Sequence, residues 1–489
     1  MKKILLVILL TFTTIESFCQ FSLMYNDTLK PFGNKSNPFN SICQDDSFYY
    51  VIGGVNNAIV KLNKQGGVVN KKAYYHYPSF YFQAYPYNSV VLSNNQIVSC
   101  AIATDTFNNN NAVVLSVDKF TLDTLWFKMY NHPDTLAASQ TGAMVFNGLT
   151  AIKATPDGGY ILTGNYNKDC ITGKIRSYLL KIDSVGNMEW RRTYNSYYTF
   201  FDVEIASDSG YFVPCTFNNV APLKLIKLNK NGVYKWSADV NSNSNPSYPM
   251  SISVFNNLVT VSSAYWYDLT NNLRAITVAK VDADLRTVIW EKNYYTFHSF
   301  ECLSLHQAMG VETLSNGDII VSGTAIENSM KGVILKLNSN GDSLWTKTYN
   351  YSPLNNYDCQ LNDLIVTDDG GFMGVGFLSD QGGSGWTAWM FKTDANGVIG
   401  WEKTMAELAE VKVYPNPARD FTNIEFGSNL NKEVSIKVYN SLGQLVLQKN
   451  LNQGASLIKL DLEAYKSGVY FIEIVGKDGV LGSGTFVKE

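Results

Sequence analysis

The sequence lacks the short motifs that mark many enzyme active sites. It contains no HExxH, no GxSxG, no Walker loop and no EF-hand loop. The absence of a CxxC pair argues against a zinc ribbon or a thioredoxin-type site. There are only 4 histidines, and isolated loop histidines are usually solvated or hydrogen-bonded. We therefore predict no catalytic residue, no metal site and no cofactor.

An excess of positive charge is also missing. Lys plus Arg number 39 and Asp plus Glu number 42, so the net charge is −3, which gives no support to a nucleic-acid partner. What the chain does have is 45% hydrophobic residues, 30 Tyr and 26 Phe in 489 residues. This composition excludes a disordered chain and favours β structure. The length indicates several domains or one large repeat array.

The N-terminus has the pattern of a secretory signal peptide. Lys2 and Lys3 precede the apolar run 4–11, and Ser17 and Cys19 are the small residues expected before a cleavage site at Gln20. A lipidated Cys19 or a buried N-terminal helix are the weaker alternatives. The run is too short to span a membrane and no other run is long enough, so we predict no integral span in the mature chain.

Six cysteines remain after this cleavage, and export permits disulfides. They are scattered, most beside apolar or aromatic residues, so buried thiols and disulfides are equally compatible with the sequence. The six are Cys43, Cys100, Cys170, Cys215, Cys302 and Cys359.

The last 79 residues alternate apolar and polar positions in short strands, as in a small antiparallel sandwich. Their motifs are Tyr414-Pro415-Asn416-Pro417, a turn containing Gly443, and a strand with Gly468 and Tyr470. In these motifs, residues 411–489 closely resemble the type A C-terminal sorting domain of the type IX secretion system. The resemblance implies recognition by the outer-membrane translocon, cleavage of the domain, and release or surface attachment of the body. A carbohydrate-binding sandwich is the alternative.

Between these ends one unit returns seven times. A Lys-apolar-Asp/Asn segment is followed by Gly, Trp and Tyr, as in Lys181-Ile182-Asp183 with Gly186, Trp190 and Tyr194. The seven copies follow one another at about 55 residues, and a turn of the type Asp157-Gly158-Gly159 precedes most of them. Four strands at this period are typical of a propeller blade. The repeated Trp is expected to pack between blades.

We therefore predict an all-β fold, a seven-bladed β-propeller followed by a small Ig-like β-sandwich. The expected domains are a signal peptide at 1–19, the propeller at 20–405, a linker at 406–412 and the sorting domain at 413–489. One strand is left over, because residues 21–26 resemble another Trp strand. This strand either closes the ring with the last blade or forms an extra edge.

The Trp pattern also resembles the repeat of quinoprotein-type propellers, at the level of the fold only. Proteins of that kind use adjacent cysteines beside the quinone, and no two cysteines are adjacent here. The spacing likewise differs from the Asp-box of sialidase propellers. Neither chemistry is carried over.

The long connections all fall on one predicted face of the propeller, and they are rich in aromatic residues. Tyrosine combines an apolar ring with a polar tip, which suits sugar or peptide ligands, although packing between blades would also explain these residues. The candidate ligand-binding residues are Tyr75, Tyr77, Tyr81, Tyr197, Tyr198, Tyr295, Phe297 and Tyr351.

These observations predict a secreted or surface-attached propeller that binds a glycan or a peptide and is delivered by its sorting domain. A polysaccharide- or peptide-processing hydrolase and a structural adhesin are the alternatives. Carboxylates that converge at the mouth of the ring would favour the hydrolase, and an uncharged aromatic mouth would favour binding.

Overall fold

The computed structural model describes most of the chain, and every structural statement below refers to this part. The described residues are 21–25, 38–53, 58–74, 81–83, 90–104, 109–133, 147–167, 175–194, 198–217, 220–240, 247–268, 273–294, 310–326, 329–351, 358–379, 386–399, 411–425, 434–440, 444–451, 457–476 and 479–489. The chain divides into two compact units, Met1–Gly400 and Trp401–Glu489. The boundary predicted at 405–413 stays a prediction, because 400–410 lie outside the described residues.

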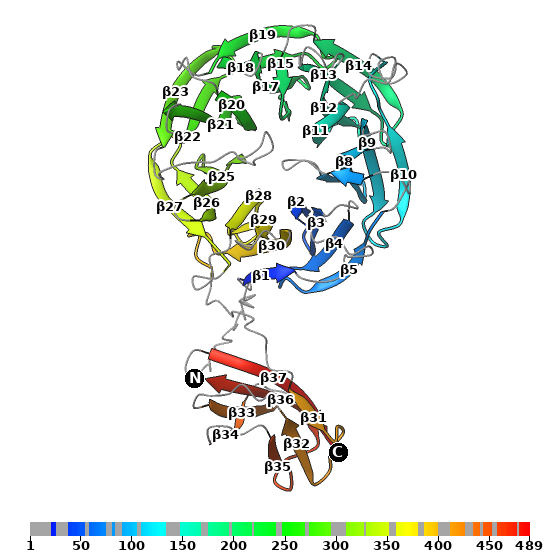
Figure 1. Ribbon diagram of the computed structural model, residues 1–489, viewed down its shortest axis with the longest axis vertical. Coiled ribbons are helices and arrows are strands. Elements are labelled where there is room, and N and C mark those ends of the chain that lie inside the picture. Colours follow the sequence, from blue (N-terminus) through cyan, green and yellow to red (C-terminus); the bar gives the residue numbers. More distant parts are fainter. Residues whose placement is uncertain are drawn as a thin grey trace, which may run out of the picture. The chain divides into compact units, whose positions relative to one another are not determined.

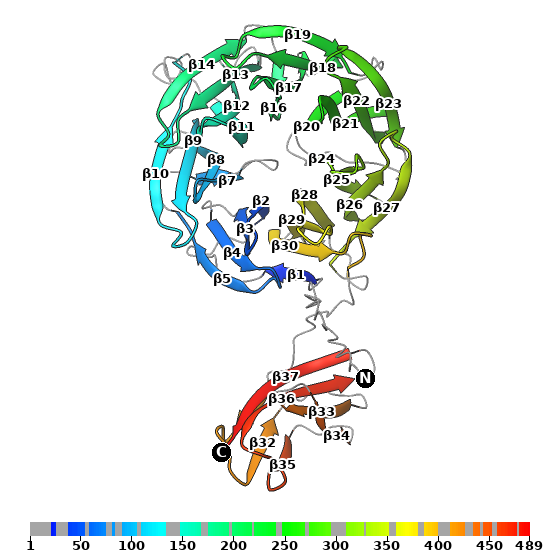
Figure 2. The ribbon, with the colours of Figure 1, turned by 180° about the vertical axis from the view of Figure 1, so that it is seen from behind.

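In the first unit, the described strands form seven antiparallel sheets arranged around a ring (Figure 1). Within each sheet the strands run in chain order from the centre of the ring to its rim, with one exception in the last sheet (Figure 2). The prediction of an all-β propeller is confirmed. We number the sheets as blades 1 to 7.

The first three blades are built from consecutive strands. Blade 1 consists of β2 (Phe39–Gln44), β3 (Phe48–Gly53), β4 (Ala58–Asn63) and β5 (Val68–Lys72). Blade 2 consists of β6 (Tyr81–Gln83), β7 (Val90–Ser93), β8 (Gln96–Thr104), β9 (Asn110–Asp118) and β10 (Thr124–Met129). Blade 3 consists of β11 (Asn147–Ala154), β12 (Tyr160–Asn167), β13 (Ile175–Ile182) and β14 (Met188–Tyr194).

The other four blades follow the same plan. Blade 4 consists of β15 (Tyr198–Phe200), β16 (Glu204–Ile205), β17 (Tyr211–Phe217), β18 (Val220–Leu228) and β19 (Tyr234–Asp239). Blade 5 consists of β20 (Ser247–Phe255), β21 (Leu258–Asp268), β22 (Leu273–Asp282) and β23 (Thr287–Tyr294). Blade 6 consists of β24 (Val311–Thr313), β25 (Ile319–Ile326), β26 (Met330–Leu337) and β27 (Ser343–Tyr349). Blade 7 consists of β28 (Asp358–Val366), β29 (Phe372–Ser379), β30 (Trp386–Thr393) and, on the rim, β1 (Phe21–Tyr25).

Strand β1 closes the ring with the last blade, which is one of the two predicted options for this strand. It pairs antiparallel with β30, and Phe21 lies opposite Lys392. In blade 3 the corresponding lysine, Lys181, lies opposite Trp190. Phe21 therefore takes the place of the repeated Trp in blade 7, and the N-terminal strand completes a sheet whose other strands lie more than 300 residues later in the chain.

The repeated Gly, Trp and Tyr join each blade to the next at the rim. A Cβ atom added at Gly186 of blade 3 would come within 2.8 Å of the Trp126 ring of blade 2. The hydroxyl of Tyr130 donates a hydrogen bond of 2.5 Å to the carbonyl oxygen of the same glycine. Gly186 has a φ of 78°, a backbone conformation that disfavours other residues. The three residue types recur together because one contact requires all three.

The same contact is found at three further junctions. The Tyr hydroxyl to Gly carbonyl distances are 2.6 Å for Tyr194 and Gly232, 2.6 Å for Tyr294 and Gly341, and 2.8 Å for Tyr349 and Gly397. The corresponding Trp ring lies beside each of these glycines. The predicted role of the Trp as a packing residue between blades is confirmed at these positions.

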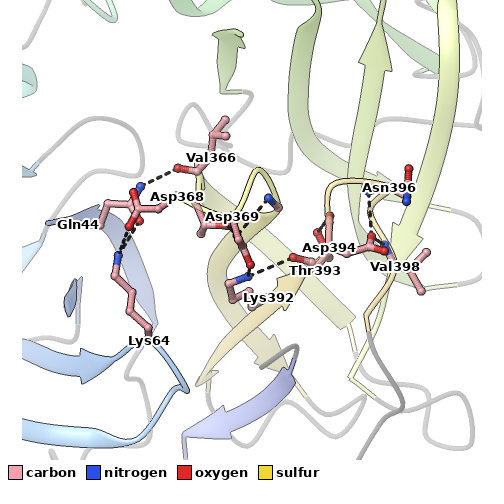
Figure 3. Close-up of polar contacts among 12 residues, drawn as sticks. Gln44, Lys64, Val366, Asp368, Asp369, Lys392, Thr393, Asp394, Asn396 and Val398 are labelled. Carbon is pink, nitrogen blue, oxygen red and sulfur yellow. Dashed lines mark hydrogen bonds and ion pairs between the residues drawn. The ribbon is translucent and has the colours of Figure 1, made fainter. Parts of the chain in front are cut away.

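The repeated Lys ties two turns of one blade together. Lys392 forms an ion pair with Asp369, whose carboxylate also accepts a hydrogen bond from the backbone N–H of Gly371 (Figure 3). Lys227 pairs with Asp208 and Lys181 with Asp157 in the same way. This contact explains why the Asp-Gly turn and the Lys-apolar-Asp segment occur together in the repeat.

Polar contacts also seal the junction between blades 1 and 7. The Lys64 ammonium donates to the Asp368 carboxylate at 2.9 Å and to the Gln44 side-chain carbonyl at 3.1 Å (Figure 3). The Gln44 amide in turn donates to the carbonyl oxygen of Val366 at 2.7 Å. The first and last blades are thus held by side chains as well as by strand β1.

Four of the six cysteines after residue 19 lie in the described residues and are not joined in disulfides: Cys43, Cys100, Cys215 and Cys359. Cys170 and Cys302 lie outside the described residues, so a disulfide between these two stays one of the predicted alternatives.

The second unit consists of two sheets that enclose one core. The smaller sheet contains β31 (Lys412–Tyr414), β32 (Phe421–Glu425) and β35 (Leu457–Asp461). The larger contains β33 (Val434–Asn440), β34 (Leu445–Leu451), β36 (Gly468–Gly476) and β37 (Gly479–Lys488). Both sheets contribute to one buried cluster, which includes Ile424, Ile436, Ile472 and Phe486. This is the predicted sandwich.

Candidate functional site

Most of the residues predicted to bind a ligand lie outside the described residues. This holds for Tyr75, Tyr77, Tyr197, Tyr295 and Phe297. The structure places the backbone of Tyr81 in β6 and that of Tyr198 in β15. The Tyr351 side chain is half-buried and packs against the core shared by blades 6 and 7. The binding role of these residues stays a prediction.

The end of the ring opposite the predicted long connections, where the short turns lie, falls within the described residues. In every blade one row of four paired residues runs from the innermost strand to the rim, and we call it the Trp row. In blade 3 it contains Lys153, Ile161, Lys181 and Trp190. The rim end is Trp in five blades, Asn70 in blade 1 and Phe21 in blade 7.

The inner ends of the Trp rows surround the centre of the ring, because they lie on the innermost strands (Figure 2). We call these residues the axial ring: Cys43, Val91, Lys153, Glu204, Ser253, Glu312 and Ile365. Unlike the rim ends, they include a base, two acids, a thiol and a hydroxyl. The row that is constant at the rim is therefore variable at the axis.

Two aspartates next to the axial ring join neighbouring blades. The Asp202 carboxylate accepts hydrogen bonds from the Ser251 hydroxyl at 2.9 Å and from the backbone N–H of Ile252 at 3.1 Å, both in blade 5. Asp363 makes the same contacts to blade 1, with the Ser41 hydroxyl at 2.6 Å and the N–H of Ile42 at 3.0 Å. We call these two contacts the Asp latches. Since donors already surround both carboxylates, their first role is structural.

The charged members of the axial ring come from three blades. Lys153 of blade 3 forms an ion pair with Glu204 of blade 4. Glu312 of blade 6 is solvent-exposed, and among the described residues it has no hydrogen bond or ion pair within bonding distance. It is nevertheless close enough to Lys153, Glu204 and Asp363 to interact electrostatically with them. Four carboxylates and one lysine thus share the short-turn end of the axis.

The proton affinities reflect this crowding of acids. Desolvation raises the pKa of Asp202 and of Asp363 to about 6, although Lys153 lowers both and donors lower them further. Desolvation, opposed by Lys153 and reinforced by Glu204 and Asp363, raises the pKa of Glu312 to about 7. Desolvation opposes the charge of Lys153, yet Glu204 and Asp202 raise its pKa. At neutral pH the group carries excess negative charge.

This arrangement is able to attract cations or amino groups and to accept hydrogen bonds from hydroxyls. It is poorly suited to nucleophilic chemistry, because desolvation raises the pKa of the Cys43 thiol and keeps it protonated. Among the described residues, no three His, Cys, Asp or Glu side chains are grouped as metal ligands.

Sequence reasoning did not single out Lys153, Glu204 or Glu312. Each is an ordinary charged residue near the end of a strand, and the signal lies in comparing repeats. When the blades are aligned on their Trp rows, the inner column is the one that changes in charge. That column was visible in principle once the repeats were recognised.

Two residues of the sorting-domain motifs, Asn416 and Tyr470, hold the last strand of the second unit in place. Asn416 donates its amide to the carbonyl of Thr485 at 3.0 Å and accepts from the N–H of Val487 at 2.9 Å. Tyr470 is buried and stacks on Phe486 at 5.1 Å. The Tyr-Pro-Asn-Pro segment therefore fixes the last strand of the chain.

The other motif residues are peripheral. Tyr414 is 44% exposed and donates to the Glu425 carboxylate at 2.9 Å, and the carbonyl of Pro415 accepts from Thr422 at 3.0 Å. Gly468 has a φ of 153° with open space around it, and Pro417 precedes Ala418, which is bridged to the last strand. Gly443 lies outside the described residues.

Residues 412–487 match the family of secretion system C-terminal sorting domains. This confirms the predicted resemblance of the C-terminal segment. The chain is exported through the type IX secretion system and is a secreted or cell-surface protein with a β-propeller body. No curated protein matches the chain. Among the described residues, no helix has the length and apolar character needed to cross a membrane.

Several solved structures are similar to the chain at low sequence identity. A quinohemoprotein alcohol dehydrogenase from Pseudomonas putida HK5 is 9% identical, with 78% of this chain and 69% of that chain covered and a TM-score of 0.43. A virginiamycin B lyase from Staphylococcus aureus is 11% identical, with 76% and 98% covered and a TM-score of 0.43. A protein of unknown function from Dyadobacter fermentans DSM 18053 is 12% identical, with 65% and 96% covered and a TM-score of 0.44.

Proposed function

We propose that the protein is an exported binding module whose propeller recognises a glycan or a peptide outside the cell. The observation that carries the proposal is the sorting domain at 412–487, since it assigns the ring to the extracellular side. In the proposed maturation, residues 1–19 are removed as a signal peptide and the sorting domain is cleaved after it has engaged the translocon.

The division of labour within the ring supports binding at the face of the long connections. The short turns at the end opposite the long connections take part in structural contacts, such as the ion pair of Lys392 with Asp369. Long loops on a rigid scaffold are free to vary in sequence. The proposed ligand contacts are the aromatic residues of those connections, with Tyr77, Tyr197 and Tyr295 in three different segments of the sequence.

The export step is tested by deleting 411–489 and by the milder variant Asn416→Ala. Asn416→Ala removes both hydrogen bonds to the last strand, so we expect less protein in the medium or on the surface. Asn450→Ala, an exposed residue of β34, is the matched control and should be exported normally. Normal export of the deletion variant would contradict the proposed route.

The binding step is tested with the full chain on glycan and peptide arrays. We expect Tyr77→Ala or Tyr197→Ala to weaken binding at least tenfold, because each removes a large contact area. The matched control is Tyr234→Ala, which removes a tyrosine that is 56% exposed on the rim strand β19. An absence of binding across broad arrays, or an equal loss in Tyr234→Ala, would count against a ligand at the loop face.

The carboxylates near the axis favour a second candidate, the hydrolase. A general acid needs a pKa near the working pH, and Glu312 has a pKa of about 7. The Asp latches occupy Asp202 and Asp363, and Glu204 is paired, so a second catalytic carboxylate is less evident. Product release from a labelled polysaccharide or peptide that is abolished in Glu312→Gln, with binding retained, would support hydrolysis over binding alone.

A further inference from the structure

A small cavity of about 30 Å³ lies beside the axis, between the innermost strands of blades 5, 6 and 7. Its size suits about two water molecules or one partly hydrated ion. Its polar lining comes from Ser251 of blade 5, Glu312 and Ser322 of blade 6, and Asp363 of blade 7. The remaining lining residues are Gly310, Val311, Ile320 and Leu364.

Gly310 is the reason that this space exists. It stands two residues before the axial ring, where blades 4 and 7 have Asp202 and Asp363 and blade 5 has Ser251. A Cβ atom at Gly310 would come within 2.8 Å of the Ser322 hydroxyl oxygen. Blade 6 therefore lacks the side chain that forms an Asp latch elsewhere, and leaves a polar hole in its place.

The Ser322 hydroxyl is the clearest sign that something fills the hole. Ser322 is only 3% exposed and lines the cavity, yet its hydroxyl has no hydrogen-bond partner among the described residues. Buried hydroxyls in folded proteins are nearly always satisfied by protein, water or an ion. The hydroxyl oxygen faces the space beside Gly310, where a water molecule or an ion can be its partner.

The other oxygens around the cavity are mostly acceptors with capacity to spare. The Glu312 carboxylate has no hydrogen bond among the described residues. In Asp363 the Oδ2 atom accepts both latch donors, and the Oδ1 atom accepts only the backbone N–H of Leu364 at 2.8 Å, which leaves it one lone pair. The Ser251 hydroxyl donates to Asp202, so its lone pairs stay available. Carboxylates, hydroxyls and water form the set of hard oxygen ligands that calcium prefers.

We propose that this cavity binds a divalent cation, with calcium as the best-fitting ion, through Glu312, Asp363 and the hydroxyls of Ser251 and Ser322. The ion would link blades 5, 6 and 7 where the Asp latch is missing. Two carboxylates are few for a calcium site, so the dissociation constant should be on the order of 0.1–1 mM, the range of extracellular modules. The inference does not depend on the identity of the ligand at the loop face.

The test uses the full-length protein, stripped with a chelator and titrated with CaCl2 by calorimetry, together with thermal unfolding. We expect one saturable site, and at 10 mM calcium the folding equilibrium constant should rise on the order of tenfold or more. Glu312→Gln and Ser322→Ala should fold, because neither residue holds another in place, and should lose most of the calcium response.

The matched controls are Glu463→Gln and Ser343→Ala, both exposed residues that do not line the cavity, which should respond like the wild type. NaCl at equal ionic strength separates binding from screening. A flat calcium titration, an equal effect of NaCl, or an undiminished response in both Glu312→Gln and Ser322→Ala would overturn the proposal. If the protein responds to calcium but binds nothing on the glycan and peptide arrays, the calcium proposal is supported and only the proposed binding function is contradicted.

Discussion

The two ends of the Trp row differ in what they tolerate. At the rim, Trp, Gly and Tyr return from blade to blade, because a ring, a left-handed turn and a hydroxyl must meet in one contact. At the axis the same rows end in residues as different as Lys153, Glu204 and Ile365. The rim is under a packing constraint that every blade shares, whereas the axis is free to carry local chemistry. Repetition in this chain therefore marks structure, and departure from it marks candidate function.

The strongest way to break the rim is Trp345→Ala. The Trp345 ring packs against Gly397 and against the core of blade 7, so its loss should reduce the free energy of unfolding by about 3 kcal/mol. Leu344→Ala next to it, at a side chain that is 51% exposed, should change stability by less than about 0.5 kcal/mol. Urea unfolding of both variants measures the difference, and equal effects would contradict a packing role for the Trp.

The Asp latches are the part of the axial region that should behave like the rim. Asp202→Ala removes the oxygen that accepts from the Ser251 hydroxyl and from the N–H of Ile252, and we expect a loss of about 2 kcal/mol. Asp239→Ala, in an exposed ion pair with Lys224, should cost about 0–1 kcal/mol. Comparable stability of the two variants in urea would show that the latch is dispensable.

A single hydrogen bond at the rim should matter less. Tyr349→Phe keeps the ring stacked on Phe391 but leaves the Gly397 carbonyl without its donor, and about 1 kcal/mol should be lost. Tyr234→Phe, on the outer edge of blade 4, is the control. Thermal unfolding would refute the contact if the two variants were indistinguishable from the wild type.

The Lys–Asp pairs inside the blades predict a modest acid sensitivity. Desolvation raises the pKa of Asp157, but hydrogen bonds from Thr155, Gly159 and Lys181 outweigh this effect and lower the pKa to about 2. Because the folded pKa lies below the ordinary value of 3.8, this stability is present above about pH 4 and is lost as pH falls towards 2. The exposed position of Asp157 limits the effect to less than about 1 kcal/mol. Unfolding at pH 5 and at pH 2.5 should show a smaller difference in Asp157→Asn than in the wild type.

The smallest effect on stability is expected in the axial ring, where the residue type varies from blade to blade. Glu312→Gln, measured without calcium at neutral pH, should leave the free energy of unfolding unchanged or raise it, because this side chain holds no other residue in place and its folded pKa of about 7, above the ordinary 4.5, means that folding disfavours its charge. A large loss of stability in chelator would show that Glu312 is a structural residue, and would remove the contrast between rim and axis at this blade.

The same contrast explains what could be predicted from the sequence. The rim could be predicted because Gly186, Trp190 and Tyr194 each meet one requirement of the contact between blades: a positive φ, a large ring and a hydroxyl donor. The repeat therefore predicted the blades and the packing role of the Trp. The position of strand β1 needed coordinates, since Phe21 and Trp401 both suit the outer edge of blade 7 in sequence terms. The axial charges were missed because residues from blades 3, 4 and 6 meet only after the ring closes.

The order of the strands in blade 7 has a consequence for how the molecule is made. Residues 21–25 precede every other described strand in the chain, but their partner strand ends at Thr393. Six blades consist of neighbouring segments and can form from local contacts, whereas the first strand stays unpaired until the last blade is available. A message truncated before β30 would leave its earliest strand as an orphan edge, open to pairing with any other chain.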